Sequence, residues 1–220
     1  FDIQADNLTF VSTDGHKLVR NRNYGIKDHQ PAAFILPKKP ATILKNLLPK
    51  ESDDVTLKFN ERNAYITMES SRLICRLIEG RYPNYNSVIP QNNPHRAIID
   101  RALFTVDRLT LLSALKRVLI FSNQSSALIK LHLESNQLVV SGQDIDYSTS
   151  AEERVPCEYG DSPMNIGFKG TFLIDILNNM GGENVIIELA DPSRAGVIVP
   201  AEQEENEDLL MLLMPMMLND

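Results

Sequence analysis

The chain repeats itself, and this internal repeat constrains its fold more than any other feature of the sequence. Residues 32–68 and 164–199 predict the same elements in the same order: a strand, a helix, a strand, a turn and a strand. Apolar positions correspond at a separation of about 131 residues, namely Phe34 with Ile166, Leu44 with Ile176, Val55 with Val185 and Ile66 with Val197. A second block, residues 1–14, matches residues 131–144 at almost the same separation. The sequence therefore predicts two copies of one domain.

The repeated pattern predicts an α+β fold. Alternating strands joined by tight turns indicate antiparallel sheets, and the complete copy has two helical segments to cover one side of them. A polar, Pro-containing linker at 91–95 separates the copies, so we expect domains at 1–92 and 93–220. The first copy opens directly on its matching strand, so we expect the N-terminal part of that domain to be missing.

Basic residues are concentrated in two segments of an otherwise acidic chain. The net charge is −7, yet residues 37–50 carry four Lys and no acid, and residues 101–117 carry four basic residues and one Asp. Both segments have helical apolar spacing, as in Leu109, Leu112, Leu115 and Ile120. Two amphipathic helices with solvated basic faces would explain this pattern. The alternative is a shared electropositive surface that attracts a polyanion.

Enzyme motifs are weak in this sequence. Ser12, Asp14 and His16 crowd a single turn, whereas a catalytic triad needs side chains that converge from separate elements. The Gly pair at 181–182 is not followed by a phosphate-loop pattern, and the other histidines lack metal-ligand spacing. We therefore expect a protein that is not an enzyme, with no metal and no cofactor.

The cysteines and the apolar runs bear on the cellular compartment. Cys75 and Cys157 lie far apart and outside any ligand pattern, so we expect core thiols in a reducing compartment. No apolar run has the length needed to span a bilayer, and the longest is interrupted by Pro215.

The stretch RYPNYNSVIP, residues 81–90, is unusual for a connection. It combines two aromatic residues, two prolines and two further apolar residues. Each Pro fixes its own φ and biases the preceding residue towards extended geometry. We therefore expect a stiff, extended and half-apolar segment, where a simple turn would use Gly, Asn and Asp.

Four segments resemble the bacterial DNA polymerase III beta subunit family, the sliding clamps that encircle duplex DNA. They are VSTDGHKLVR (11–20), LIEGRYPNYNSVIP (77–90), ENVIIELADPSRAGVIV (183–199) and LLMPMML (212–218). Family members contain three copies of one domain, each with antiparallel sheets and two helices lining the DNA-facing side. The resemblance implies most of the second domain and all of the third. It also implies a cytoplasmic, non-catalytic processivity subunit that forms a homodimeric ring when full length.

The resemblance further implies a hydrophobic pocket for a short peptide. Its carriers would be the DNA polymerase III alpha subunit, the clamp loader delta subunit and repair proteins with the same motif. Prolines would stiffen the pocket walls and methionines would adapt to different partners. Met217 and Ser87 stand where relatives carry Arg, so we expect a less basic rim. By matching position, the pocket residues are Thr13, Gly15, His16, Lys17, Leu18, Pro83, Val88, Ala195, Leu212, Leu213, Met214, Pro215, Met216 and Met217.

The family also implies nonspecific contact with the phosphates of double-stranded DNA. We expect this contact from the basic segments, at Lys38, Lys39, Lys45, Arg108 and Arg117. Ile120 and Phe121 match positions at the dimer interface, although a place in the ordinary core is an equal alternative. The rival function is a peptide-binding scaffold module without any DNA function. Basic helices on one concave face would favour the clamp.

Overall fold

The computed structural model describes residues 1–27, 30–90, 95–99 and 108–218. The chain divides into two compact units, which are described separately. Unit 1 comprises Phe1–Phe10 and Asn23–Asn84, and unit 2 comprises Val11–Arg22 and Tyr85–Asp220. Unit 2 is therefore discontinuous in sequence. Most of the predicted linker at 91–95 lies outside the described residues, so the predicted domain boundary stays a prediction.

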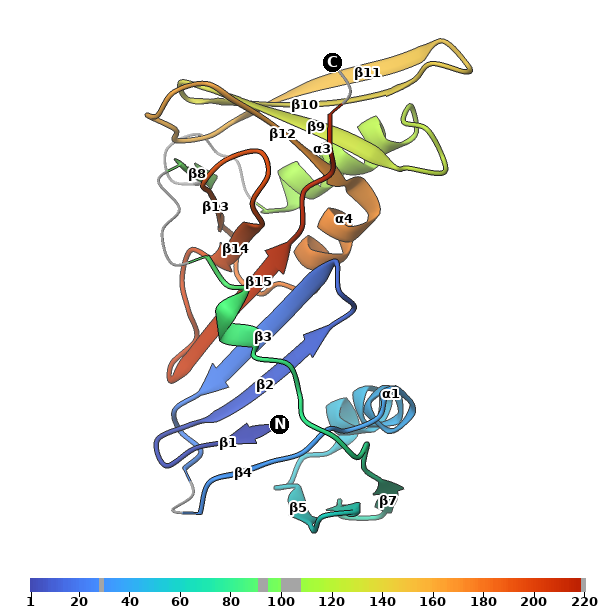
Figure 1. The fold of residues 1–220 in the computed structure, drawn as a ribbon, viewed down its shortest axis with the longest axis vertical. Coiled ribbons are helices and arrows are strands. Elements are labelled where there is room, and N and C mark those ends of the chain that lie inside the picture. The colour runs from blue at the N-terminus through green and yellow to red at the C-terminus, as the bar shows by residue number, and fades with distance from the viewer. Residues whose placement is uncertain (28–29, 91–94, 100–107, 219–220) are drawn as a thin grey trace. The chain divides into compact units, whose positions relative to one another are not determined.

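Unit 1 combines one helix with short antiparallel strands (Figure 1). Its strands follow the orders β4-β1-β2 and β5-β6-β7. The core contains Ile3, Leu8, Phe34, Leu44, Ala64, Ile66 and Leu77. The elements are β1 (Asp2–Ile3), β2 (Leu8–Thr13), β4 (Ala32–Ala33), α1 (Lys38–Leu47), the 3-10 turn η1 (Leu48–Lys50), β5 (Thr56–Phe59), β6 (Asn63–Thr67) and β7 (Arg72–Arg76).

Two prolines frame the start of α1. Pro37 is extended and precedes the helix, and Pro40 lies in the first turn, where its missing N–H has no intrahelical partner to lose. Leu44 is the buried residue of α1, so most of the helix surface faces solvent. Pro49 then lies in η1, because its ring would clash with the carbonyl four residues earlier if the α-helix continued.

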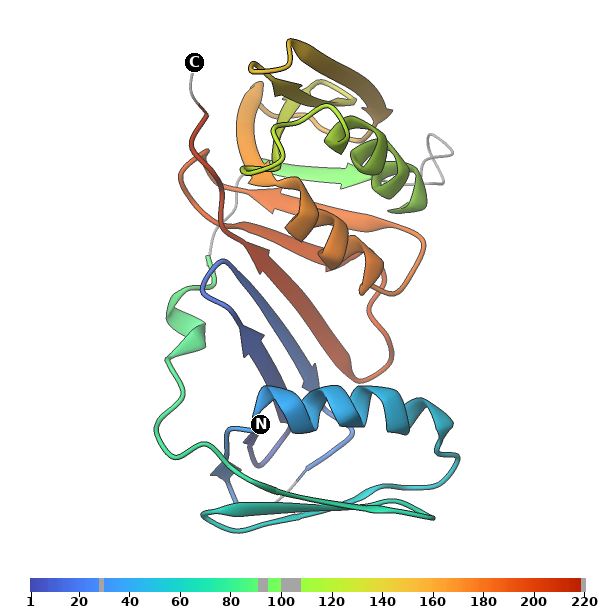
Figure 2. The same ribbon diagram turned by 90° about the vertical axis from the view of Figure 1, so that its right-hand side faces the viewer.

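Among the residues that the structure describes, unit 2 has two α-helices and strands from two sheets; Figures 1 and 2 show their arrangement. One sheet has the order β11-β10-β9-β12, and the strands of the other follow the order β3-β15-β14-β13-β8. The elements are β3 (Lys17–Asn23), the 3-10 turn η2 (Tyr85–Ser87), β8 (His95–Ile99), α3 (Arg108–Leu119), β9 (Leu128–Glu134), β10 (Gln137–Asp144), β11 (Thr149–Pro156), β12 (Met164–Lys169), α4 (Gly170–Asn178), β13 (Val185–Leu189), β14 (Gly196–Pro200) and β15 (Glu207–Leu213).

Helices α3 and α4 pack side by side against the sheets of unit 2 (Figure 2). The buried stripe of α3 comprises Leu111, Leu112, Ala114, Leu115 and Val118. The sequence predicted an apolar stripe from Leu109 to Ile120. This was wrong at both ends, because Leu109 and Ile120 are 54% and 78% exposed. At 3.6 residues per turn, these two positions fall outside the stripe centred on Leu115.

The strand orders confirm the predicted α+β repeat. The order β4-β1-β2-β3 in the first copy corresponds to β12-β9-β10-β11 in the second, and β5-β6-β7 corresponds to β13-β14-β15. Helix α1 occupies the place in the first copy that α4 occupies in the second. The paired residues Phe34 and Ile166 are both buried, as are Leu44 and Ile176.

Candidate functional site

The turn between β2 and β3 is held by hydrogen bonds of its own side chains. Asp14 Oδ1 accepts from the backbone N–H groups of His16 (3.0 Å) and Lys17 (2.9 Å). Thr13 Oγ1 accepts from the N–H of Gly15 (3.1 Å) and donates to the carbonyl of Lys17 (2.8 Å). Gly15 has a φ of +86°, in the left-handed region that favours glycine. The turn therefore presents His16 and Lys17 on a fixed backbone.

Asp14 serves this turn as a hydrogen-bond acceptor. Partial burial works to raise the pKa of its carboxyl group, but the N–H groups of Lys17 and His16 outweigh it, so the pKa lies below its ordinary value. A triad aspartate would instead orient the imidazole ring of its histidine. This geometry gives no support to catalysis at Ser12, Asp14 and His16.

The tail, residues 214–218, continues from β15 (Figure 1) and is fixed at two alternate residues. The N–H of Met214 donates to the carbonyl of His16 at 2.9 Å. The N–H of Met216 donates to the carbonyl of Gly167 at 2.8 Å, and these two residues form an antiparallel bridge. The tail backbone is therefore tied both to the turn and to strand β12.

Gly167 permits this close approach. A Cβ at position 167 would lie 2.7 Å from the carbonyl oxygen of Met216 and 2.8 Å from Cδ2 of Leu218. The first of these atoms is backbone, so a side-chain rotation cannot relieve the clash. Sequence reasoning missed this residue, although a glycine inside a strand is a signal for close backbone approach.

Beneath the turn and the tail lies a buried apolar group that we call the Leu18 cluster. It consists of Leu18, Ile89, Ala195, Val197, Leu210 and Leu212. Exposed apolar residues lie close in sequence to its members Ile89 and Leu212: Val88 is 55%, Met214 44% and Met217 84% exposed. Leu212 belongs to the cluster, but Leu213 is fully buried in the main core of unit 2, because neighbouring strand residues point to opposite faces.

The segment 81–90 differs in part from the expected extended form. Residues 85–87 form η2, and the N–H of Val88 donates to the carbonyl of Tyr85 at 3.4 Å. Each Pro restrains only itself and the preceding residue, so the middle of the segment is free to turn. Tyr85 and Ile89 pack with the Leu18 cluster. Pro83 belongs to unit 1, so its role in the pocket stays a prediction.

Side chains of α4 extend the site beyond the residues expected from sequence. Lys17 Nζ lies 2.9 Å from Oδ2 of Asp175 and 4.5 Å from the centroid of the Phe172 ring. Lys169 Nζ lies 5.0 Å from the same centroid, and the His16 ring lies 6.0 Å from it. We call these five residues the Phe172 cluster. No sequence signal distinguishes Lys169, Phe172 and Asp175 from other residues of a strand end and a helix.

The predicted DNA-contacting residues of α1 are accessible. Lys38, Lys39 and Lys45 are all exposed, and the first turn of α1 contains no acidic residue. None of the three forms an ion pair within the described part of the chain. The placement of α1 leaves these ammonium groups available to phosphates.

The two predicted arginines of α3 already have protein partners. Arg108 donates from Nε to the carbonyl of Gly182 at 3.0 Å and from Nη1 to the carbonyl of Leu177. Arg117 binds both carboxylate oxygens of Glu153 at 2.6 and 2.7 Å, and this hydrogen bonding holds the pKa of Glu153 below its ordinary value. DNA contact by these arginines stays a prediction that requires such bonds to be shared or exchanged.

The residues predicted at the dimer interface are not in the core. Ile120 is 78% exposed and Phe121 is 40% exposed, just after the end of α3. Two apolar side chains in contact with solvent are consistent with an interface, which stays a prediction.

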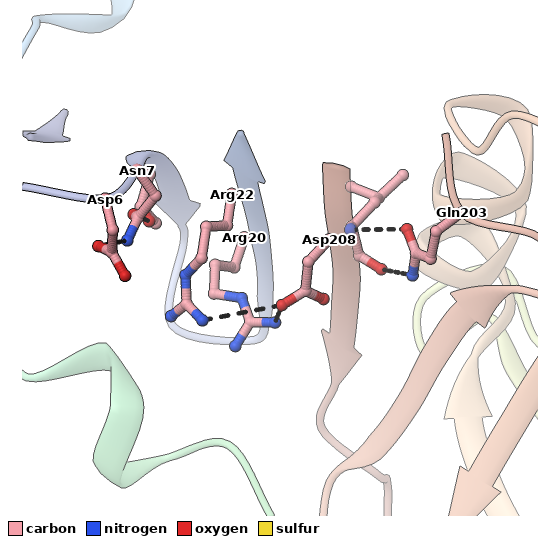
Figure 3. A network of polar contacts seen from close by, with 8 residues as sticks. Asp6, Asn7, Arg20, Arg22, Gln203 and Asp208 are labelled. Carbon is pink, nitrogen blue, oxygen red and sulfur yellow. Dashed lines mark hydrogen bonds and ion pairs between the residues drawn. The ribbon is translucent and has the colours of Figure 1, made fainter. Parts of the chain in front are cut away.

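An ionic network joins β3 to β15 (Figure 3). Arg20 Nη2 donates to Oδ2 of Asp208, and Arg22 Nη1 lies 3.9 Å from the same oxygen. Nearby, the side chain of Gln203 forms two hydrogen bonds with the backbone of Leu209, each of 2.9 Å. No local sequence pattern indicates this network, because its members lie far apart along the chain.

The described residues also bear on metal binding, membrane spanning and cysteine chemistry. No group of three or more His, Cys, Asp or Glu residues there is placed to hold a metal ion. Within the same ranges, no helix is both long and apolar enough to cross a membrane. Both cysteines are free, and burial raises the pKa of the Cys157 thiol to about 11, as expected for a core residue.

Comparison with protein-family models identifies both parts of the chain. Residues 1–84 match the central domain of the DNA polymerase III beta subunit, and residues 86–217 match its C-terminal domain. The beta sliding clamp of Pseudomonas aeruginosa is 27% identical over 218 residues, which are 99% of this chain and 56% of that protein. The beta sliding clamp of Synechococcus elongatus is 27% identical over 206 residues, which cover 90% of this chain and 52% of that protein.

Solved structures agree with this comparison. The Pseudomonas aeruginosa clamp superposes with a TM-score of 0.89 at 25% identity, covering 99% of this chain and 57% of that one. The Bartonella birtlesii clamp, solved with griselimycin bound, gives 0.87 at 27% identity with the same coverage. The chain thus spans little more than half the length of these relatives. It belongs to the DNA polymerase III beta subunit family.

Proposed function

We propose that the chain acts as part of a DNA sliding clamp, and that its turn, tail and Leu18 cluster form a site for short peptides of partner proteins. Its relatives named as sliding clamps support this proposal. The chain spans about 56% of the length of the first of these relatives. The activity of a whole clamp is therefore proposed for the longer protein to which this chain would belong.

One observation carries the peptide site. The tail backbone is fixed at Met214 and Met216, the side chains of Met214 and Met217 remain exposed, and the strand that leads into the tail contributes Leu210 and Leu212 to the buried Leu18 cluster. A rim that is already ordered loses little conformational entropy when a peptide binds. Exposed methionines are flexible and polarizable, so they adapt to different apolar side chains. This combination suits partners such as the polymerase III alpha subunit and the clamp loader delta subunit.

We expect a peptide of the Gln-Leu-x-Leu-Phe type to bind with micromolar affinity. Burial of two or three of its apolar side chains would contribute about 4–8 kcal/mol. Association entropy and ordering of the peptide oppose much of this gain. A micromolar Kd requires about 8 kcal/mol net, so hydrogen bonds from the Gln side chain and the peptide backbone must contribute as well.

The DNA function belongs to the same proposal. The exposed lysines of α1 would contact phosphates without reading base edges, which allows a clamp to move along the duplex. In a full-length homodimer, Ile120 and Phe121 would contribute to ring closure in the cytoplasm. The present 220 residues should not form that ring without the remaining domain.

Peptide titration tests the site. A labelled peptide is titrated by fluorescence anisotropy against the chain and against a variant that lacks residues 214–220. We expect the deletion to weaken binding at least tenfold while the far-UV circular dichroism spectrum is retained, because both main cores lie upstream of the tail.

Ile74→Ala is the matched control, since it removes an apolar side chain that is 58% exposed in unit 1. It should leave the peptide affinity unchanged. Equal affinity of the deletion variant and the intact chain would place the peptide site elsewhere.

A further inference from the structure

We propose that Lys169 gives the peptide site a preference for an acidic side chain in its partner, an inference that rests on the proposed peptide-binding function. Lys169 is the last residue of β12, directly before α4. Its ammonium group lies 5.0 Å from the centroid of the Phe172 ring. Ser87 and Met217 stand where relatives carry Arg, which predicted a less basic rim of the peptide site. Lys169 would supply a positive charge to this rim from a different element, the end of β12.

The strand register places Lys169 beside the tail. Gly167 and Met216 form an antiparallel bridge. The two strands run in opposite directions, so Lys169, two residues after Gly167, lies on the same side of the bridge as Met214, two residues before Met216. The N–H of Met214 also bonds to His16, whose ring lies 6.0 Å from Phe172. Lys169 is therefore adjacent to the exposed apolar surface that would receive the peptide.

The charges of the Phe172 cluster are unbalanced. Asp175 is its carboxylate, and it is bound to Lys17 at 2.9 Å. Lys169 forms a cation–π contact with Phe172 but no ion pair with any residue that the structure describes. The cluster thus carries two lysines and one carboxylate, which leaves one positive charge without an anionic partner.

A carboxylate from the bound peptide would complete this arrangement. The aromatic ring holds the half-buried ammonium group of Lys169 near the tail, and a bound peptide would displace water from both. Complementary charges at such a rim contribute mainly to specificity and association rate, while the apolar side chains supply most of the affinity. A peptide with Asp or Glu next to its apolar residues is therefore the partner that fits.

The test uses pairs of labelled peptides that differ only by Asp or Asn. The residue is placed in turn at the x position of Gln-Leu-x-Leu-Phe and on each flank of the motif. At low salt, we expect the intact chain to bind the Asp peptide about three- to fivefold more tightly at one or more positions, and the difference should shrink at high salt. Lys169→Gln should abolish the preference and Lys169→Glu should reverse it. The far-UV circular dichroism spectra of both variants should match that of the intact chain.

Lys58→Glu provides a control with the same change of net charge at an exposed position of unit 1, and it should keep the preference. If no peptide binds the intact chain, the proposed peptide function itself fails. If Asp and Asn peptides bind equally at every position, or if Lys169→Gln keeps the preference, the inference about Lys169 is overturned. The inference would also be overturned if Lys169→Glu lost duplex DNA binding and kept the peptide preference. Lys169 would then bind DNA phosphates instead of the peptide.

Discussion

Arg20 donates a hydrogen bond from Nη2 to Oδ2 of Asp208, a residue 188 positions later in the chain. The side chain of Arg20 is only 11% exposed and that of Asp208 is 34% exposed. Arg22 approaches the same oxygen at 3.9 Å. One carboxylate therefore neutralises a largely buried guanidinium group and ties β3 to β15 within unit 2.

Removal of this carboxylate should loosen β3. Asp208→Ala leaves the Arg20 charge buried without its partner, which we expect to cost about 2 kcal/mol in local stability. Hydrogen exchange at the amides of β3 measures this cost as a lower opening free energy. As a control, Glu202→Ala removes an exposed carboxylate from the loop before β15. It should change the opening free energy of β3 by less than about 0.5 kcal/mol. Equal protection in both variants would show that the ion pair does not hold the strand.

A methyl group at Gly167 should displace the tail. In Gly167→Ala, the new Cβ meets the carbonyl oxygen of Met216 at 2.7 Å, so the tail must shift away from β12. We expect peptide affinity to fall about tenfold, with a thermal midpoint close to that of the intact chain. Gly181→Ala is the matched control, because a Cβ there meets no atom within 4 Å. Unchanged peptide affinity in Gly167→Ala would show that the tail position does not set binding.

The lysines of α1 should control DNA contact. The triple variant Lys38→Glu, Lys39→Glu and Lys45→Glu should abolish loading of the full-length clamp on DNA and leave peptide binding intact. Neutral Gln variants should reduce the salt slope of DNA binding by roughly 0.9 for each lysine that contacts a phosphate.

The control is a second triple variant with the same change of net charge. It replaces three exposed residues of unit 1 by Glu, namely Lys58, Arg62 and Arg72. It should retain loading. If the two triple variants load equally well, the lysines of α1 are not the phosphate contacts, and the rival function of a peptide scaffold without a DNA role gains support.

Asp14 should titrate at low pH. Its folded-state pKa is depressed by the N–H groups of the turn, so its carboxylate contributes stability above the unfolded pKa of about 3.9. That contribution is lost as the pH falls through the folded value. The carboxyl carbon shift of Asp14 in NMR spectra should therefore show a midpoint below about 3.9. A midpoint at or above this value would mean that the turn does not stabilise the ionised form.

The internal repeat made much of the fold predictable. Matching apolar positions such as Phe34 and Ile166 identified corresponding strands, because both copies must bury the same face of the same element. The helical stripe of α3 was predicted less well, since four apolar residues fit more than one face and only packing selects Leu111 over Leu109.

Candidate site residues could be predicted only where they stand together in one short sequence motif. The turn at 13–17 and the tail are local motifs, so sequence reasoning could name their residues as candidates, and their role in a peptide site stays a prediction. The partners of Lys17 and Met214, which are Asp175 and His16, depend on contacts between distant segments. Lys169 was missed for the same reason, whereas Gly167 carried a local signal, a glycine inside a strand, that does not by itself show which segment approaches it.

The discontinuity of unit 2 has a consequence for biosynthesis. Residues 11–22 leave the ribosome well before strand β15, beside which β3 lies, because Asp208 of β15 follows Arg20 of β3 by 188 residues. At 5–20 residues per second, β3 waits roughly 10–40 s for this neighbour. During that interval its edge is unpaired and open to other strands, a known route to misassembly. The nascent chain should therefore depend on chaperone protection until its final residues are synthesised.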